Sequence, residues 1–245
     1  MNTARFVFFG TLNDLLERAL RGKEIVLTFA EHQTVKHLIE SLGVPHVEVG
    51  EVTANGQMVG WEYRPRNGDR IEVRPAFGWE GEPRFVLDNH LGRLAAYLRM
   101  LGFDTLYKNN YCDEELAALL TKDSRILLTR DRRLLMRKVV RYGYCLRSLE
   151  PQEQLQEVIR RFDLLRQARP FHRCLRCNHP LERVEKGAIL DRLEPKTKLY
   201  YEEFARCPAC DQIYWQGSHF ERMQGMLAGL KTSADKADFY QTHRN

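Results

Sequence analysis

The feature that most constrains the fold of this chain is a repeated change of hydrophobic period between residues 84 and 147. Short apolar runs, typical of buried strands, alternate with segments whose apolar residues recur every three or four positions, as on one face of a helix. The runs RFVLD, FDTLY, RILLT and YCLR predict strands, and the segments between them predict helices. Strands that alternate with helices form right-handed crossovers around a parallel sheet. We therefore expect an α/β domain over residues 84–165, with ligands beyond the carboxyl ends of its strands.

Three aspartates lie near that edge of the predicted sheet. Asp88 ends the first strand, Asp113 opens the helix after the second strand, and Asp131 follows the third strand. Each precedes a helix, where aspartate is a favoured N-cap, so a capping role is an alternative for every one of them. Three carboxylates at one edge are also suited to Mg²⁺ or Mn²⁺, which prefer oxygen ligands.

Basic residues gather in the same region. The stretch from Arg125 to Arg147 contains eight Lys or Arg and a single acid, Asp131. Its segment DRRLLMRKVVRY predicts a helix on which three arginines, spaced four residues apart, share one face. An ordinary solvated helix face is the alternative. The lack of compensating acids favours a phosphate-binding face, and a divalent metal would reconcile the nearby carboxylates with a phosphodiester.

The order of these motifs resembles the Mut-7 C-terminal RNase family, a branch of the PIN-like nucleases. The resemblance rests on RFVLDNHLGRLAAYLRMLGFDTLY, DEEL and RILLTRDRRLL, followed by two Cys-x-x-Cys motifs and YWQGSH. It implies a metal-dependent RNase in which Asp88, Asp113 and Asp131 hold Mg or Mn, with Glu114 as the nearest candidate for a fourth catalytic acid. The residues predicted to contact RNA are Arg93, Arg99, Arg130, Arg133, Arg137 and Arg141.

Two Cys-x-x-Cys pairs, Cys174 with Cys177 and Cys207 with Cys210, are separated by 29 residues. Four thiolates close a tetrahedral coordination sphere, so the spacing predicts a structural zinc ribbon over residues 170–230. Two disulfides are the alternative, and a reducing compartment disfavours them.

The other cysteines and the histidines near the two pairs are expected to have no chemical role. We expect Cys112 and Cys145 to be buried near strands. His172, His179 and His219 are within range to replace a zinc-binding cysteine, but a surface position is the preferred interpretation of each. The tail 231–245 loses periodicity and is interpreted as a short helix or as disordered.

Residues 1–78 predict a separate small domain. The strands RFVFF and EIVLTF, the helix VKHLIESL capped by Thr34, and strands around two Gly-containing turns give a β-β-α-β-β order. This order resembles a ubiquitin-like β-grasp domain, and VTANGQMV with RNGDRIEVRPAFG resembles its sulfur-carrier members. Sulfur carriers use a free C-terminal Gly-Gly, whereas this chain continues through the linker GWEGEP. We expect a docking module for a protein partner; an accessory role in sulfur transfer is a weaker alternative.

Composition limits the class of protein. The 245-residue chain has a net charge of +5, and no apolar run approaches the ~20 residues that cross a bilayer. We expect a cytoplasmic protein that does not bind membranes. The predicted function is an Mg- or Mn-dependent endoribonuclease, a hydrolase whose partner is RNA, with tRNA or another structured RNA as the candidate substrate. The alternative is a non-catalytic RNA-binding adaptor, associated with tRNA or the ribosome, that uses the basic helix and the zinc ribbon.

Overall fold

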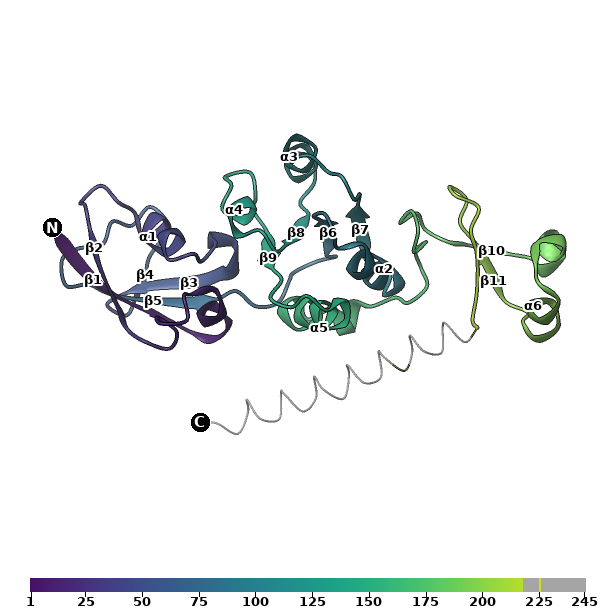
Figure 1. Cartoon of the computed structure of the whole chain (residues 1–245), viewed down its shortest axis with the longest axis horizontal. Helices are drawn as coiled ribbons and strands as arrows, with labels where there is room; N and C mark the ends of the chain where they lie inside the picture. Colours follow the sequence, from purple (N-terminus) through teal and green to yellow (C-terminus); the bar gives the residue numbers. More distant parts are fainter. Residues whose placement is uncertain (218–224, 226–245) are drawn as a thin grey trace. The chain divides into compact units, whose positions relative to one another are not determined.

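The computed structural model describes residues 1–217 and 225 of the chain (Figure 1). The chain divides into two compact units: Met1–Gly92 with Tyr107–Asp163, and Arg93–Leu106 with the chain from Leu164 onward. Within the described residues, no helix combines the length and the apolar character that crossing a membrane requires. The tail 231–245, interpreted above as helical or disordered, lies outside the described residues.

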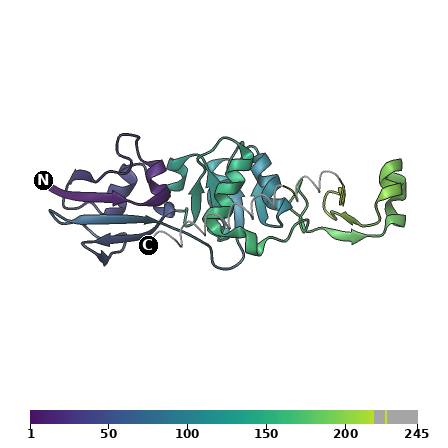
Figure 2. The ribbon, with the colours of Figure 1, turned by 90° about the horizontal axis from the view of Figure 1, so that it is seen from below.

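The N-terminal sheet of the first unit has the strand order β2-β1-β5-β3-β4. Its strands β1 and β5 are parallel, whereas the other neighbouring pairs are antiparallel. Figure 2 shows the purple β1 alongside the blue strands of this sheet. A five-stranded sheet of this order, with one helix after its first hairpin, confirms the predicted β-grasp fold. Its elements are β1 (Asn2–Phe8), the 3₁₀ helix η1 (Gly10–Leu15), β2 (Ile25–Phe29), α1 (Val35–Ser41), the 3₁₀ helix η2 (His46–Glu48), β3 (Val49–Ala54), β4 (Gln57–Met58) and β5 (Arg70–Pro75).

Local sequence explains the boundaries of these elements. The Thr34 hydroxyl accepts a hydrogen bond from the backbone N–H of His37, 3.3 Å away, and so caps α1. Asn55 and Gly56 both have positive φ, 51° and 82°, as the tight turn between β3 and β4 requires. The 3₁₀ helix η1 was not predicted, and it buries Leu12 and Leu15.

Three strands of the first unit form a parallel sheet. β6 (Arg84–Leu87) pairs with β8 (Ile126–Thr129), which pairs with β9 (Gly143–Cys145). Residues 85–87 and 126–128 are completely buried, as expected for strands covered on both faces. The helices of this region are α3 (Asp113–Lys122), α4 (Arg132–Leu135) and α5 (Pro151–Phe162), which confirm the predicted α/β class.

The basic helix predicted after Asp131 is wrong in length, because α4 ends at Leu135. Asp131 caps its start, Leu134 and Leu135 are buried, and a turn then closes with Val140 N–H donating to the carbonyl of Arg137 at 3.0 Å. The segment that follows α4 carries several like charges and two β-branched valines, which disfavour further helix. The three arginines predicted to share a helix face therefore lie on different local structures: Arg133, Arg137 and Arg141.

The second unit combines a helix and strand with a small antiparallel sheet. The helix α2 (Gly92–Met100) begins at Gly92, where the first segment of the first unit ends, and β7 (Asp104–Tyr107) follows it. The antiparallel sheet has the order β10-β11-β12 and encloses a small core of Ile189, Leu193, Phe204 and Ile213. Its elements are β10 (Glu182–Val184), the 3₁₀ helix η4 (Lys186–Arg192), α6 (Pro195–Tyr200), β11 (Phe204–Arg206) and β12 (Ile213–Trp215); the 3₁₀ helix η3 (Leu164–Gln167) precedes them.

Candidate active site and metal centre

A cavity of about 620 Å³, here called the acid pocket, lies where β6 and β8 end. Two of the three predicted acids, Asp88 and Asp131, line it. Asp88 directly follows β6, and Asp131 follows β8 after Arg130. The parallel pairing of the two strands thus brings together carboxylates that are 43 positions apart in sequence. The residues lining the acid pocket are Asp88, Asn89, His90, Leu91, Arg130, Asp131, Leu149 and Gln154.

The hydroxyl of Thr129 connects the two carboxylate residues. It donates to Asp88 Oδ2 at 2.7 Å and accepts from the backbone N–H of Asp131 at 2.9 Å. Thr129 is fully buried, so its rotamer is fixed by packing as well as by these bonds. Asp88 Oδ1 accepts from the N–H of Asn89 at 2.7 Å. The Asp88 carboxylate is therefore held by one hydrogen bond on each oxygen.

Asp131 has both a capping role and an unused oxygen. Its Oδ1 accepts from the N–H groups of Arg133 at 2.8 Å and Leu134 at 3.4 Å, so the N-cap alternative is correct for this residue. Its Oδ2 has no hydrogen-bond partner among the described residues. The side chain is exposed, and one carboxylate oxygen is thus available to a ligand while the other holds α4.

Asn89 also lines the acid pocket and carries an oxygen without a hydrogen-bond partner among the described residues. Its Oδ1 is buried and forms no hydrogen bond with the part of the chain that the structure describes. A buried amide oxygen without a partner is costly, and a cation that it coordinates would remove that cost. Two carboxylates with one amide oxygen are the hard-oxygen donors that Mg²⁺ and Mn²⁺ take from proteins. The residues present therefore fit a divalent cation.

The other two predicted acids are not brought into the acid pocket by any described contact. Asp113 is the first residue of α3, and its side chain lies outside the described residues. The N-cap of α3 is Cys112, and its backbone N–H donates to Glu115 Oε2 at 3.1 Å. Asp113 therefore does not occupy the N-cap position considered for it above. Glu114 is exposed and does not line the pocket. Cys112 is exposed rather than buried, whereas Cys145 is buried as expected.

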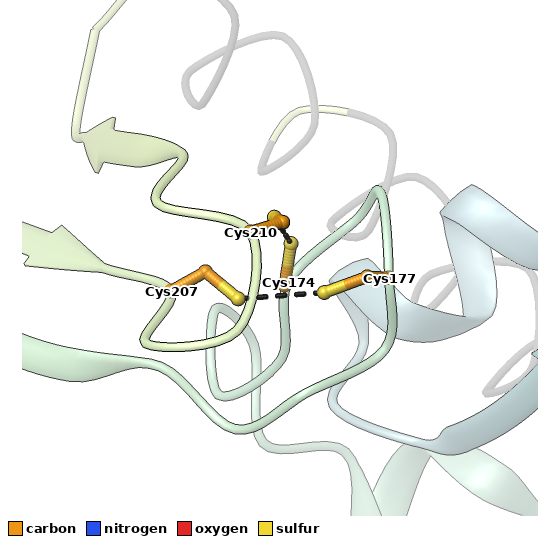
Figure 3. Close-up of side chains that lie close together, drawn as sticks. All are labelled: Cys174, Cys177, Cys207 and Cys210. Atoms are coloured by element: carbon orange, nitrogen blue, oxygen red, sulfur yellow. Dashed lines mark hydrogen bonds between the residues drawn. The ribbon is translucent and has the colours of Figure 1, made fainter.

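The two Cys-x-x-Cys pairs converge in the second unit. Figure 3 shows the four side chains pointing toward one another, and their sulfur atoms all lie within 4.8 Å of one another. Cys174 Sγ lies 3.5 Å from Cys210 Sγ, and Cys177 Sγ lies 3.4 Å from Cys207 Sγ. These separations exceed a disulfide bond of about 2.05 Å and match the edges of a thiolate tetrahedron. Four cysteines in this arrangement fit structural zinc.

Tyr214 supports this cluster from β12. Its hydroxyl lies 3.1 Å from Cys174 Sγ and also accepts the N–H of Leu175 at 3.1 Å. Burial alone would raise the pKa of Cys174, but hydrogen bonds from Tyr214 and from the backbone N–H groups of Cys177 and Arg176 outweigh it and lower that pKa to about 6. Zinc requires the thiolate form, so these donors favour the ligand state of Cys174, whereas burial and the neighbouring thiols raise the pKa of Cys177 and of Cys210.

Arg99, predicted from the sequence as an RNA contact, is buried against the first cysteine pair. Its side chain is only 5% exposed, and its Nη1 donates to the carbonyls of Leu175 and Arg176 at 3.0 Å each. Asn178 completes this junction, since its amide accepts the N–H of Thr105 at 2.9 Å and donates to Asp104 at 2.8 Å. The first cysteine pair is thereby fixed against α2 and β7.

Comparison with known protein families decides the assignment. A family model described as "Mut7-C RNAse domain" matches residues 83–227, and one described as "Mut7-C ubiquitin" matches residues 1–79. The chain belongs to the Mut7-C RNAse family. No curated protein matches it. Among solved structures, a putative molybdopterin converting factor, subunit 1, from Pyrococcus furiosus is 21% identical over 31% of this chain and 98% of its own, with a TM-score of 0.25.

Membership of the Mut7-C RNAse family indicates nuclease-type chemistry with RNA as the substrate class. Four of the predicted RNA contacts are exposed and form no side-chain hydrogen bond or ion pair with the described residues, which leaves them available to phosphates. Only one of these, Arg130, lines the acid pocket. The four are Arg93, Arg130, Arg133 and Arg141. Arg137 is also exposed, and it takes part in a further interaction, so it is not counted with these four.

Sequence reasoning missed several residues of these Mut7-C sites. Thr129 and Asn89 are next to predicted positions, and the only available signal was the short run of polar residues after each apolar strand. Tyr214 and Asn178 act across long sequence separations and gave no local signal. His172 and His179 are exposed and outside the cysteine cluster, as interpreted, whereas His219 lies outside the described residues.

Proposed function

We propose that this protein is a divalent-metal-dependent endoribonuclease whose catalytic site is the acid pocket. The observation that carries the proposal is the bridge from Asp88 through Thr129 to Asp131, which places two carboxylates together where two parallel strands end. Ligands of open parallel sheets bind at that edge. The family match supports a nuclease, and the acid pocket brings two carboxylates and the exposed Arg130 into one cavity.

Asp88, Asp131 and the Oδ1 of Asn89 would hold Mg²⁺ or Mn²⁺. Bound there, the cation supplies Lewis-acid stabilisation of phosphate charge and lowers the pKa of a coordinated water. Thr129 is a positioning residue, because its hydroxyl orients Asp88 and the backbone of Asp131 without facing the substrate. Arg130 binds the phosphate that is cut, since its exposed guanidinium has no protein partner and is next to Asp131 in sequence.

The roles of Asp113 and Glu114 remain proposals that rest on the family resemblance. Both stand in the first turn of α3. The variants Asp113→Asn and Glu114→Gln distinguish the two roles. The variant that removes a metal ligand should lose cleavage activity, and the variant that does not should keep it.

The test compares metal-dependent cleavage by wild type, Asp88→Asn and Asp131→Asn. Asparagine keeps a capping oxygen while removing the charge, so both variants should fold and lose at least 100-fold in cleavage rate, a typical loss for a catalytic electrostatic group. Asp191→Asn is the matched control, because Asp191 is exposed and has no partner among the described residues. Wild-type rates in Asp88→Asn and Asp131→Asn would contradict the proposal. RNA binding without cleavage by wild type would favour the adaptor.

A further inference from the structure

The β-grasp domain packs directly against the parallel-sheet domain within the first unit. Glu48 of η2 is 1% exposed, and its carboxylate accepts from Arg147 Nη1 at 2.8 Å and Nη2 at 3.0 Å. The same carboxylate accepts the backbone N–H of Cys145 in β9 at 2.6 Å. Burial alone would lower the pKa of Arg147, but Glu48 raises it above its ordinary value, so Arg147 stays charged. A two-pronged, buried ion pair fixes the orientation of the two domains.

A second cavity, of about 450 Å³, lies along this junction, and it is here called the arginine groove. The β-grasp domain contributes residues at the end of η1 and in the following loop, and the parallel-sheet domain contributes residues around β8 and β9. The lining residues are Asp14, Leu15, Arg21, Arg130, Arg132, Cys145, Leu146 and Arg147.

The charge of the arginine groove is positive. Four arginines and one carboxylate, Asp14, line it. Glu48 balances Arg147, which leaves three arginines against Asp14. Burial raises the pKa of the Cys145 thiol, so this side chain adds no negative charge. The groove therefore suits an anionic ligand.

Backbone carbonyls of the β-grasp domain hold two of these arginines in place. Arg132 Nη1 donates to the carbonyl of Leu15 at 2.6 Å. Arg21 donates to Leu16 and Asp14 carbonyls, from Nε at 3.1 Å and from Nη2 at 3.0 Å. A neutral carbonyl orients a guanidinium without cancelling its charge, unlike a carboxylate. Both side chains are thus ordered in advance and keep further N–H groups for a phosphate.

Arg130 connects the two cavities, because it lines both the acid pocket and the arginine groove. A strand whose phosphate is cut in the acid pocket would bring its neighbouring phosphates past Arg130 into the groove. We infer that the β-grasp domain forms one wall of the RNA-binding surface, with Arg21 as its phosphate contact. This inference rests on the proposed function for the direction of the strand, and it gives the ubiquitin-like domain a role in substrate binding. Positively charged grooves that follow the backbone are a general mode of single-strand binding.

The test measures RNA binding separately from cleavage. A labelled single-stranded RNA is titrated against the full-length Asp88→Asn protein, with and without Arg21→Gln, at several salt concentrations. Arg18→Gln is the matched control, because Arg18 is exposed, lies three positions before Arg21 and does not line the groove. Arg21→Gln should weaken binding roughly 5- to 10-fold and reduce the slope of log K against log salt by about 1, whereas Arg18→Gln should change neither.

Each outcome decides one of the two proposals. Equal binding and equal salt slopes for Arg21→Gln and Arg18→Gln would overturn the role of the β-grasp domain, even if wild type cleaves RNA. A second outcome would also overturn this role. If an acidic peptide binds the Asp88→Asn protein through Arg21, and Arg21→Gln leaves RNA binding unchanged, the groove binds a protein partner instead. If Arg21→Gln weakens RNA binding but the wild-type protein does not cleave RNA, the role of the β-grasp domain in RNA binding is supported and the proposed nuclease function is contradicted.

Discussion

Replacement of Thr129 by valine tests the link between the two carboxylates. The change keeps the shape of the side chain and removes the hydroxyl that donates to Asp88 and accepts from Asp131 N–H. A hydrogen bond to a charged group contributes about 1.5–3 kcal/mol, and a neutral one about 0.5–1.5 kcal/mol. Asp88 is partly exposed, so in the variant its carboxylate can bind water instead. We therefore expect the lower end of both ranges, which together give a loss of about 2 kcal/mol in the free energy of local opening.

Thr53→Val is a matched control for this substitution. Thr53 is also a buried threonine in a strand, but its hydroxyl has no partner among the described residues. Removing an unpaired buried hydroxyl should be neutral or should stabilise by up to about 1 kcal/mol. The two variants thus differ in hydrogen bonding and share the same chemical change.

Hydrogen exchange measured on peptides that cover β6 and β8 gives the opening free energy of the site directly. Thr129→Val should speed exchange there roughly 30-fold, the equivalent of about 2 kcal/mol, and lower the cleavage rate. Thr53→Val should leave the exchange of β6 and β8 unchanged. Equal exchange in the two variants would refute the claim that Thr129 holds the acids.

Two further predictions concern the zinc cluster and the β-grasp domain. Cys207→Ser should release about one equivalent of zinc and make the chain from Leu164 onward sensitive to protease, because a structural site contributes folding free energy; unchanged zinc content by elemental analysis would contradict this. Burial alone would raise the pKa of Asp69, but hydrogen bonds from Arg66, Tyr63 and Asn55 lower it below 3.8, so Asp69 stabilises the fold above that pH and the contribution is lost as pH falls. Asp69→Asn should be less stable at neutral pH and lose less stability on acidification; parallel pH–stability curves would count against it.

The features whose positions the sequence predicted are those encoded within a few residues. The cysteine spacing, the aspartates that end apolar strands and the Thr34 cap each need only a short segment to be recognised. The parallel pairing of β6 with β8 in the structure then brings Asp88 and Asp131 together.

The parts that sequence could not predict depend on distant partners. Arg99 has the positive charge expected of an RNA contact. Only its carbonyl partners, 76 and 77 positions away, show that it supports the cysteine cluster. Glu48 and Arg147 form their ion pair across a separation of 99 residues. The early end of α4 leaves Val140 buried just before β9, and this burial acts together with the local like charges and β-branched valines that disfavour further helix.

The measurement that tests the central claim most directly is cleavage of a labelled RNA by the metal-depleted full-length protein before and after Mn²⁺ is added back, with the product ends identified. Depletion must leave the structural zinc in place, which elemental analysis verifies. The account predicts cleavage only after addition of Mn²⁺, none by Asp88→Asn, and linear phosphate ends, because water attacks the phosphorus. Equal cleavage without added metal, equal cleavage by Asp88→Asn, or cyclic phosphate ends from attack by the RNA 2′-hydroxyl would contradict it.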